Sequence, residues 1–454
     1  MAERHVVIGG NAAGMTAASR AKRLAPDLAV TILEAGPYIS YSICGLPYWL
    51  GGQVSKFSDL VLFTPEKLRN ERGIEARLLT RAVEILPSRR AVVTERVATG
   101  EREILSYDKL LVATGYRPKT PKLSGIDSRG VFTASHVADG EAIAAWLDGG
   151  RRQKAALIGG GYIGLEMAEA LRRRGLDVTL VEKNAQILRS VDADLAELVQ
   201  KELEQNGVRI LTGRAATRIL ARGDGTVEAV EVAAGSLIPA DLVFVDVGVV
   251  PRVDLATSAG IRLGPSGAIA VDETLATNVP AVYAAGNCAE LTHLVTGRPF
   301  FDPLGTVAAK QGRVAGENMA GRRSRFRGAL GTAVVKVFGL TAARTGLTTA
   351  RARREGFSIV DGTVRSRFSA GYLEGGDPGT VKVIVERESR RLLGAQIIGS
   401  AAASARINAL ATAITARLTV DDAAQLDFAY APPVGALWDP VLIAMNAALK
   451  KLDH

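Results

Sequence analysis

One pattern occurs twice in this chain of 454 residues, and it constrains the fold more than any other feature. Residues 4–36 and 154–184 each read as an apolar strand, a glycine-rich turn, a helix and a second strand that ends in an acid. Such glycines let the backbone approach a pyrophosphate, the helix N-terminus offers free N–H groups, and the acid hydrogen-bonds a ribose. The repeat predicts an α/β fold with two Rossmann-like dinucleotide-binding domains.

The two copies match the dinucleotide fingerprint unequally. The three glycines and the acid of each copy are Gly159, Gly161, Gly164 and Glu182 in the second, and Gly9, Gly10, Gly14 and Glu34 in the first. In the first copy Asn11 stands in place of the middle glycine. A single glycine fingerprint is weak evidence, whereas two copies, each with its strands, helix and acid, indicate two dinucleotide sites.

The acid of the second copy bears on which nucleotide binds there. The carboxylate of Glu182 suits the two free ribose hydroxyls of NAD and repels the additional phosphate of NADP. Lys183, the next residue, weakens that repulsion. The sequence therefore favours NADH and leaves NADPH possible.

Composition and scattered residues exclude several classes of protein. The two cysteines, Cys44 and Cys288, cannot form a disulfide scaffold, and no signal peptide or long apolar run is present, so we expect a cytoplasmic protein without membrane contact. The net charge of +9 is spread along the chain without a nucleic-acid motif, so no nucleic-acid partner is expected. The four histidines have no ligand spacing, and we predict no metal site.

Further segments resemble the flavin-dependent pyridine nucleotide–disulfide oxidoreductases over nearly the whole chain. The segments are "LLVATGYRPKTP" (110–121), "LVFVDVGVVPRVDLA" (242–256) and "VYAAGNCAELTHLVTGRP" (282–299). "SYSICGLPYWLGG" (40–52), "DPLGTVAAKQGRVAGENMAG" (302–321) and "YAPPVGALWDP" (430–440) are similar to its single-cysteine branch. That branch contains coenzyme A disulfide reductases, coenzyme A persulfide reductases and water-forming NADH oxidases.

The resemblance implies a domain order and two cofactor sites. It implies an FAD-binding domain at 1–112 and 246–323, an NAD(P)H-binding domain at 113–245, and an α+β dimerisation domain at 324–454 that makes a homodimer. The residues expected at the two cofactors are Gly9, Gly10, Ala13, Gly14, Glu34, Ala113, Thr114, Gly115, Gly286, Asn287 and Lys310 for FAD, Gly159, Gly161, Tyr162, Ile163, Gly164, Glu166 and Glu182 for the nucleotide, and Gly248 on the segment that returns to the FAD domain. Tyr162 is expected to gate the nicotinamide site. Asn287 replaces the usual aspartate, so we expect FAD binding to persist in a weaker form.

Cys44 is the predicted redox-active residue. Glu34 marks the adenosine end of FAD, and ten further residues span up to about 33–36 Å, enough to bring Cys44 to the flavin ring. Pro47 suits the first turn of a helix, and a thiol just before a helix has a lowered pKa, which favours the attacking thiolate. No second cysteine is spaced to pair with it, so Cys44 should act alone, and Cys288 is interpreted as a packing residue.

Supporting residues follow from the resemblance. Tyr430, and less securely Tyr372, would donate a proton near the dimer interface, although a buried structural tyrosine is the alternative for each. The residues expected to bind a coenzyme A substrate are Arg20, Lys22 and Arg23 on the first helix, and Ser40 and Ser42 beside the cysteine. A merely solvated helix face is the alternative for the three basic residues.

The leading interpretation is a flavin-dependent oxidoreductase. Electrons pass from NAD(P)H through FAD to Cys44, which reduces the disulfide or persulfide of a small thiol such as coenzyme A. The alternatives are an NADH oxidase or peroxidase that reduces dioxygen or peroxide, and a redox-sensing flavoprotein with little turnover.

Overall fold

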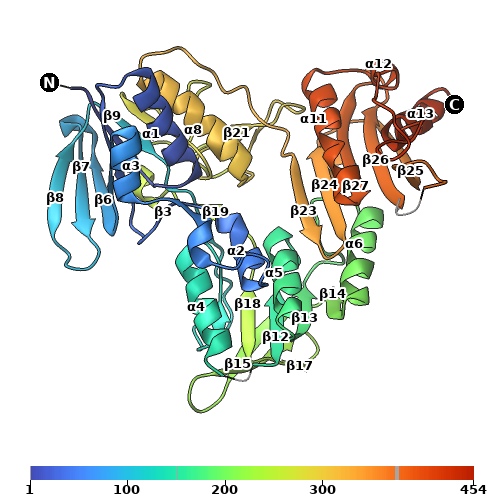
Figure 1. The fold of residues 1–454 in the computed structure, drawn as a ribbon, viewed down its shortest axis with the longest axis horizontal. Coiled ribbons are helices and arrows are strands. Elements are labelled where there is room, and N and C mark those ends of the chain that lie inside the picture. Colours follow the sequence, from blue (N-terminus) through green and yellow to red (C-terminus); the bar gives the residue numbers. More distant parts are fainter. Residues whose placement is uncertain (1, 151, 374–377) are drawn as a thin grey trace.

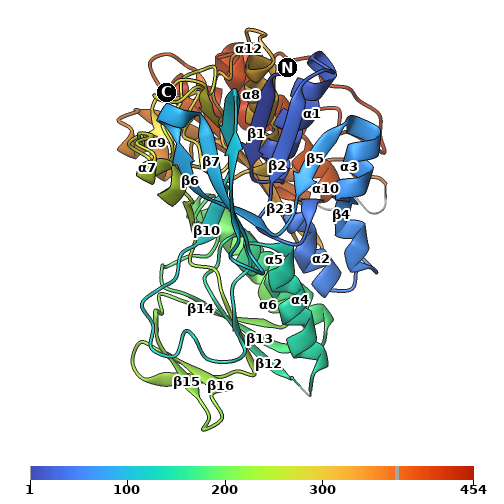
Figure 2. The same ribbon diagram turned by 90° about the vertical axis from the view of Figure 1, so that its left-hand side faces the viewer.

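Three five-stranded sheets organise the chain, one in each of the three lobes that Figure 1 shows. The structure is a computed structural model, and it describes residues 2–150, 152–373 and 378–454. Figure 2 turns the molecule so that the second lobe lies below the first.

The first lobe has a parallel sheet in the order β20-β9-β1-β2-β5. Its elements are β1 (Arg4–Ile8), α1 (Ala12–Leu24), β2 (Ala29–Leu33), β3 (Ile39–Tyr41), α2 (Leu46–Leu50), β4 (Val61–Phe63), α3 (Pro65–Arg72), β5 (Ile74–Arg77), β6 (Thr80–Leu86), β7 (Ala91–Arg96), β8 (Arg102–Ser106), β9 (Lys109–Val112), α7 (Asp254–Ser258), β20 (Val282–Ala284), β21 (Leu291–Thr292), β22 (Pro299–Phe300) and α8 (Gly305–Met319). Helices α1 and α8 pack closely because Gly312 faces α1: a Cβ there would lie 2.2 Å from the Ala13 carbonyl oxygen.

The second lobe repeats that plan. Its parallel sheet has the order β11-β18-β12-β13-β14, so each sheet places the strand before the glycine turn at its centre. Its elements are β11 (Val131–Phe132), α4 (Val137–Asp148), β12 (Lys154–Ile158), α5 (Tyr162–Arg173), β13 (Asp177–Glu182), α6 (Ala193–Gln205), β14 (Val208–Thr212), β15 (Ala216–Ala221), β16 (Val227–Val232), β17 (Ser236–Pro239) and β18 (Leu242–Val245). The prediction of two Rossmann-like units is confirmed.

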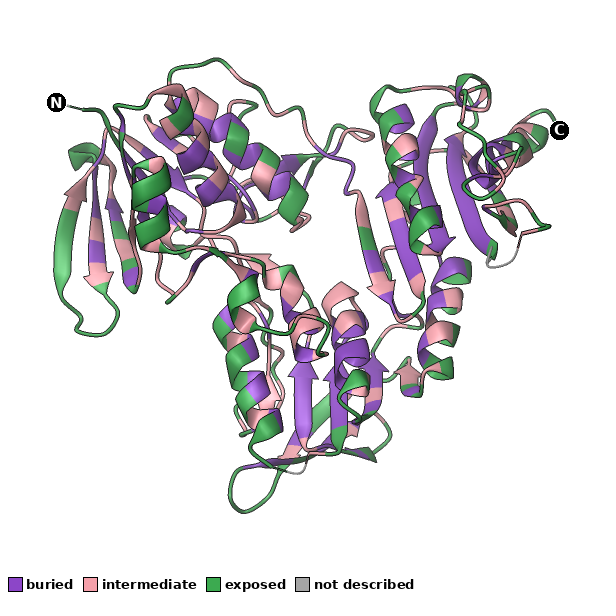
Figure 3. Ribbon diagram, in the orientation of Figure 1, coloured by how far each residue is buried: buried purple, intermediate pink, exposed green. Residues whose placement is uncertain are grey.

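The third lobe is an antiparallel sheet, β23-β24-β27-β26-β25, covered by helices. Its elements are β23 (Ala333–Val337), β24 (Leu340–Gly346), α9 (Thr349–Arg354), β25 (Ile359–Arg367), β26 (Pro378–Glu386), β27 (Leu392–Gly399), α10 (Ala401–Ala405), α11 (Ile407–Thr415), α12 (Val420–Ala423) and α13 (Pro440–Leu452). Figure 3 shows its central strands almost wholly buried. The predicted α+β type is confirmed, and β26 and β27 form a hairpin around the "ESRR" turn at residues 388–391.

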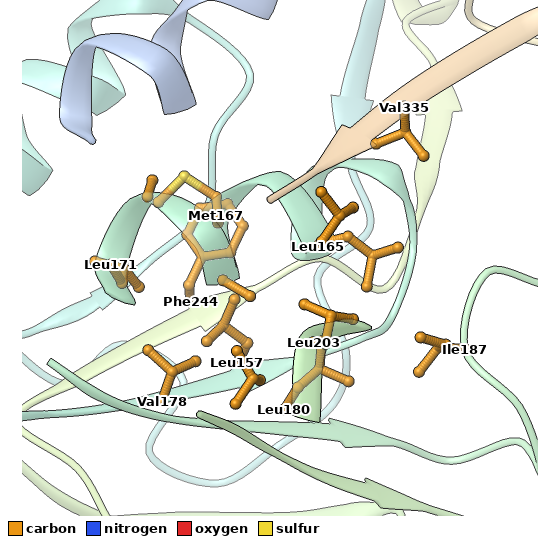
Figure 4. Packing of buried hydrophobic residues seen from close by; sticks show 14 of the residues in the cluster. Leu157, Leu165, Met167, Leu171, Val178, Leu180, Ile187, Leu203, Phe244 and Val335 are labelled. Atoms are coloured by element: carbon orange, nitrogen blue, oxygen red, sulfur yellow. The ribbon is translucent and has the colours of Figure 1, made fainter. Parts of the chain in front are cut away.

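The largest core joins the lobes. It is centred on the second lobe but includes Leu46 and Leu50 of α2. Helix α2 belongs to the first lobe and packs against α4 and α5 of the second. Val335 of β23 also reaches this core, near Leu165 of α5 in Figure 4. The turn before α2 therefore stands where the first two lobes meet.

The chain crosses between the first two lobes through a two-stranded ribbon. Here β10 (Tyr116–Pro118) pairs with β19 (Val249–Pro251) in antiparallel fashion. The domain limits given above stay a prediction. Among the helices of the described ranges, none combines the length and apolarity that crossing a bilayer requires.

Candidate active site

The two glycine turns have nearly the same backbone geometry. Gly9 has φ +107°, and a Cβ there would lie 2.2 Å from the carbonyl oxygen of Ala113. Gly159 has φ +111°, and its Cβ would lie 1.9 Å from the carbonyl oxygen of Asp246. Only glycine fits either position without a backbone shift.

The acids at the ends of the second strands are also arranged alike. Glu34 accepts backbone hydrogen bonds from Gly10 at 2.9 Å and from Gly36 at 2.8 Å. Glu182 accepts one from the N–H of Gly160 at 2.9 Å and another from the N–H of Asn184 at 2.8 Å. Each carboxylate thus supports its own glycine turn and keeps spare lone pairs for ribose hydroxyls.

The structure explains why the first copy tolerates Asn11. That residue has φ −109°, and the matching Gly161 has φ −82°. Both values lie in a region open to every residue type, so this position does not require glycine. A Cβ on Gly161 would instead come within 3.1 Å of the Asp246 carboxylate, whereas the first copy has Ala113 at the corresponding strand end.

A cavity of about 510 Å³ runs from the first glycine turn to Cys44. The predicted residues that line it are Gly9, Gly10, Ala13, Glu34, Cys44, Ala113, Thr114, Gly115, Gly286 and Asn287. Gly14 lies beneath the turn, where a Cβ would meet the Gly9 carbonyl oxygen at 1.9 Å. The N-termini of α1 and α8 both border the cavity, which suits negatively charged phosphate groups.

Cys44 lies in a short 3₁₀ turn, Ile43–Gly45, that leads directly into α2. Pro47 is in the first turn of α2, as predicted. The cysteine is a free, exposed thiol that faces the cavity, whereas Cys288 is fully buried and its Sγ donates to the carbonyl of Val112 at 3.4 Å. Packing is therefore the role of Cys288.

Comparison with known proteins gives this arrangement a family. Residues 3–312 match the family model "Pyridine nucleotide-disulphide oxidoreductase", and residues 332–439 match the dimerisation domain of the same family. The chain belongs to this family. It is therefore a flavin-dependent NAD(P)H oxidoreductase that uses FAD and a pyridine nucleotide.

Individual relatives of this oxidoreductase cover nearly all of its length. An NADH oxidase of Methanocaldococcus jannaschii is 36% identical over 99% of this chain and 100% of the relative. An NAD(P)H sulfur oxidoreductase (CoA-dependent) of Pyrococcus abyssi is 38% identical over 96% of both. The solved structure of an NAD-dependent persulfide reductase from A. fulgidus is 39% identical, with a TM-score of 0.96 over 99% of this chain and 83% of that one.

The residues around the cavity fit FAD in this oxidoreductase. The glycine turn and Glu34 would hold the pyrophosphate and adenosine ribose, and the segment around Asn287 would hold the ribityl chain. Buried Gln311 of α8 fixes that segment, because its Oε1 accepts a hydrogen bond from the Gly286 N–H at 2.8 Å. Thr114 Oγ1 donates a hydrogen bond to the Arg252 carbonyl at 2.6 Å. This bond links the two chain segments that cross between the first two lobes.

The prediction that the Cys44 thiol has a lowered pKa is wrong, because the protein groups around it raise the pKa. The thiol opens to the cavity, but the surrounding protein desolvates it and raises its pKa, and the Glu166 carboxylate raises it further. Helix α2 has only five residues, so its dipole offsets little of this. The chain itself therefore favours the protonated thiol.

Glu166 lies on α5 and reaches across the lobe junction to the cysteine turn. Its carboxylate accepts a hydrogen bond from the Tyr48 hydroxyl of α2 at 3.4 Å. Burial raises the pKa of Glu166 to about 7, although the Tyr48 bond lowers it. Near neutral pH the carboxylate is thus partly charged, and each added negative charge disfavours the Cys44 thiolate.

We expect Glu166→Gln to lower the pKa of the Cys44 thiol, because it removes a nearby negative charge. The measurement is the pH profile of alkylation by iodoacetamide in reduced, NADH-free holoenzyme. The alkylation profile should move to lower pH, and NADH-dependent turnover should then begin at lower pH as well. Glu197→Gln, at an exposed position of α6, should leave both profiles in place. An unmoved profile in Glu166→Gln contradicts the influence of this carboxylate on the thiol.

Several predicted site residues lie away from the cavity. Lys310 is an exposed residue of α8, and Gly248, with φ +95°, follows β18. Arg20 pairs with Glu317 at 2.6 Å, and the other two basic residues of α1, Lys22 and Arg23, donate to nearby backbone carbonyls. The binding of substrate by these three residues stays a prediction. The charge of Arg20 is already paired with Glu317.

The two serines beside the cysteine differ in exposure. Ser40 is buried in a left-handed conformation with φ 52°, and its N–H donates to the Gly10 carbonyl at 2.9 Å. It therefore joins the cysteine segment to the glycine turn. Ser42 is exposed one turn before the helix and remains available to a ligand.

The chain does not bring its own tyrosines to Cys44. Tyr372 and Tyr430 are 76% and 49% exposed in the third lobe, and neither lines the cavity. Desolvation and the neighbouring Tyr430 raise the pKa of Tyr372. Tyr372 and Tyr430 lie on neighbouring segments, which are joined by a hydrogen bond from the Ala370 N–H to the Pro432 carbonyl at 2.9 Å.

Sequence reasoning missed other residues of the cavity. Tyr41, Arg81, Tyr116, His136 and Arg252 all line it. Burial raises the pKa of Tyr116 to about 12, so its hydroxyl stays a hydrogen-bond donor beside Cys44. Tyr41, Tyr116 and Arg252 lie in segments that resemble the family, whereas Arg81 and His136 lie outside them, and the sequence does not signal that the five converge on one cavity. Among the residues that the structure describes, no cluster of three His, Cys, Asp or Glu side chains could hold a metal ion.

Proposed function

We propose that this oxidoreductase reduces the disulfide or persulfide of a coenzyme A-type thiol at Cys44, with NADH as the electron source. The observation that carries the proposal is that Cys44 opens into the same cavity as the first glycine turn and Glu34. The names of relatives that span nearly the whole chain, among them the CoA-dependent sulfur oxidoreductase and the persulfide reductase, support this substrate class.

The proposed reaction needs one sulfur of the chain and one electron pair. FAD, when bound, supplies the transfer of two electrons from the pyridine nucleotide to sulfur. The Cys44 thiolate attacks one sulfur of the substrate, a mixed disulfide forms, and the other thiol leaves with a proton. The electron pair then cleaves the mixed disulfide, which releases the second thiol and restores the Cys44 thiolate. The exposure of Cys44 at the cavity leaves room for this attack.

The leaving thiolate needs a proton donor, and we assign this role to Tyr430 of a second copy in a homodimer, with Tyr372 beside it. The matched dimerisation domain and the exposure of Tyr372, Val434, Leu437 and Trp438 support the assembly. Light scattering should give a particle of twice the 47.8 kDa chain mass. A monomer at micromolar concentration would contradict the assignment of Tyr430 to its partner's site.

Glu182 supports NADH as the preferred nucleotide. The residue is 8% exposed and its carboxylate is held against the second glycine turn, where a 2′-phosphate would meet a fixed negative charge. The two free cysteines support a reducing compartment, so we also propose a cytoplasmic location.

A second candidate function is an NADH oxidase. The observation in its favour is that the relative from Methanocaldococcus jannaschii, which matches 99% of this chain, has that name. The same cavity, thiol and nucleotide site would serve, with dioxygen or peroxide in place of the disulfide.

Anaerobic turnover separates these functions. We expect the purified holoenzyme to consume NADH with coenzyme A disulfide or coenzyme A persulfide in the absence of oxygen, and faster than with air alone. Rapid consumption with air and none with either sulfur substrate would instead establish the oxidase. A spectral change on NADH addition without turnover of any acceptor would indicate a redox sensor.

A further inference from the structure

A second cavity lies where the first lobe meets the third. Its volume is about 340 Å³, and it shares no lining residue with the cavity that holds Cys44. Leu294 and Val295, from the turn between β21 and β22, form one wall, and Phe357 and Ile414 of the third lobe lie across from them. In Figure 1, β21 lies on the side of the first lobe nearest the third. The cavity falls within the range of small-molecule sites, roughly 300–1,000 Å³.

Two arginines of the third lobe also line this cavity, and the backbone holds them on neighbouring segments. Arg391 directly precedes β27 and forms an isolated antiparallel bridge with Thr419. Arg417 stands two residues before Thr419, just after α11, with φ 59°. Glycine is the usual residue in this conformation after a helix, so the fold places an arginine side chain where none is the easier choice.

The charges of these two arginines are not matched within the described ranges of the chain. The adjacent Arg390 shows the contrast, because it pairs with Asp421 at 2.7 Å. Neither Arg391 nor Arg417 makes an ion pair with a described residue, and Glu386 is the one described acid that lines the cavity. The cavity therefore combines apolar walls with an excess of one positive charge.

We propose that this cavity binds a small monocarboxylate with an apolar body, such as an aryl or a medium-chain aliphatic acid. Guanidinium groups hold a carboxylate through paired, charge-assisted hydrogen bonds, and the apolar walls remove the body of the ligand from water. Glu386 repels a second negative charge, which disfavours polyphosphates such as the nucleotides. Because the two cavities are separate, the inference does not depend on the reaction proposed at Cys44.

Calorimetric titration of the FAD-loaded enzyme with 2-naphthoate, with saturating NAD⁺ present, tests the proposal. The two cofactors keep the probe out of the dinucleotide sites. We expect one molecule of 2-naphthoate to bind per chain. The neutral analogue 2-naphthylmethanol should bind about tenfold more weakly or not at all, because it keeps the apolar body and lacks the charge.

The double variant Arg391→Gln with Arg417→Gln should lower the affinity for 2-naphthoate about tenfold or more. Arg387→Gln is the matched control, since it removes an exposed arginine of the same β26–β27 turn that does not line the cavity, and it should keep wild-type affinity. The arginines of the double variant make no ion pair with a described residue, so its FAD content should equal that of the wild type.

Three results would overturn the proposal: no binding of 2-naphthoate to the wild type, equal binding of the alcohol, or full affinity in the double variant. The last would show that the probe occupies another site. The comparison of the two probes uses the wild type alone, so it decides the matter even if the double variant does not fold.

Discussion

Replacing Cys44 by serine should lower turnover with a coenzyme A disulfide or persulfide by at least ~10³-fold, because a serine hydroxyl cannot form the mixed disulfide. FAD content and the rate at which NADH reduces the flavin should stay close to wild type, since the cofactor contacts lie elsewhere in the cavity. Steady-state NADH consumption measures the first quantity, and rapid mixing of enzyme with NADH measures the second.

Cys288→Ala is the matched control for that variant. It removes the other thiol of the chain, which is buried and donates only to backbone carbonyls. It should lose stability through the cavity it leaves and retain turnover. Loss of activity in Cys288→Ala together with full activity in Cys44→Ser would reverse the roles assigned to the two cysteines.

Two glycine-to-alanine substitutions should show which glycine turn binds FAD and which binds the pyridine nucleotide. Gly9→Ala should produce a protein that binds FAD about 100-fold more weakly, or one that fails to fold, because the new Cβ overlaps the Ala113 carbonyl at a positive φ. Gly159→Ala meets the Asp246 carbonyl in the same way. It should retain FAD and raise the KM for NADH about 100-fold.

Flavin absorbance per protein and NADH kinetics measure these two effects. Gly260→Ala is the control, because that glycine also has a positive φ, +74°, but nothing lies within 4 Å of its Cβ position. It carries the backbone strain without the overlap and should keep both cofactors. Loss of FAD in Gly159→Ala, with normal FAD in Gly9→Ala, would show that the two copies hold the opposite cofactors.

The duplicated unit was predictable because its chemistry is local. Gly9 and Gly159 are required by a positive φ and by a carbonyl oxygen at their Cβ positions, and Glu34 and Glu182 support the turns that precede them. These demands act within one strand–helix–strand segment, so they appear in the sequence as a spacing. The α+β type of the third lobe was predictable through the family resemblance.

The electrostatics of the cysteine could not be read from the sequence. Helix α2 is short, and it packs on α5 of another lobe, which brings Glu166 to the Cys44 thiol. The contact between Arg344 and Tyr162 likewise depends on how the lobes meet. Such contacts join residues far apart in the chain, and neither residue type nor spacing signals them.

The claim on which this account depends is that the Cys44 sulfur lies against the flavin. Anaerobic titration of the wild type and Cys44→Ser with NADH, followed by absorbance, tests it most directly. We predict that the wild type, prepared with Cys44 as a mixed disulfide with coenzyme A and titrated at a pH that ionises the thiol, develops a long-wavelength thiolate–flavin band, and that the serine variant shows the loss of flavin absorbance without this band. The same band in both proteins, or its absence from the wild type, would contradict the account.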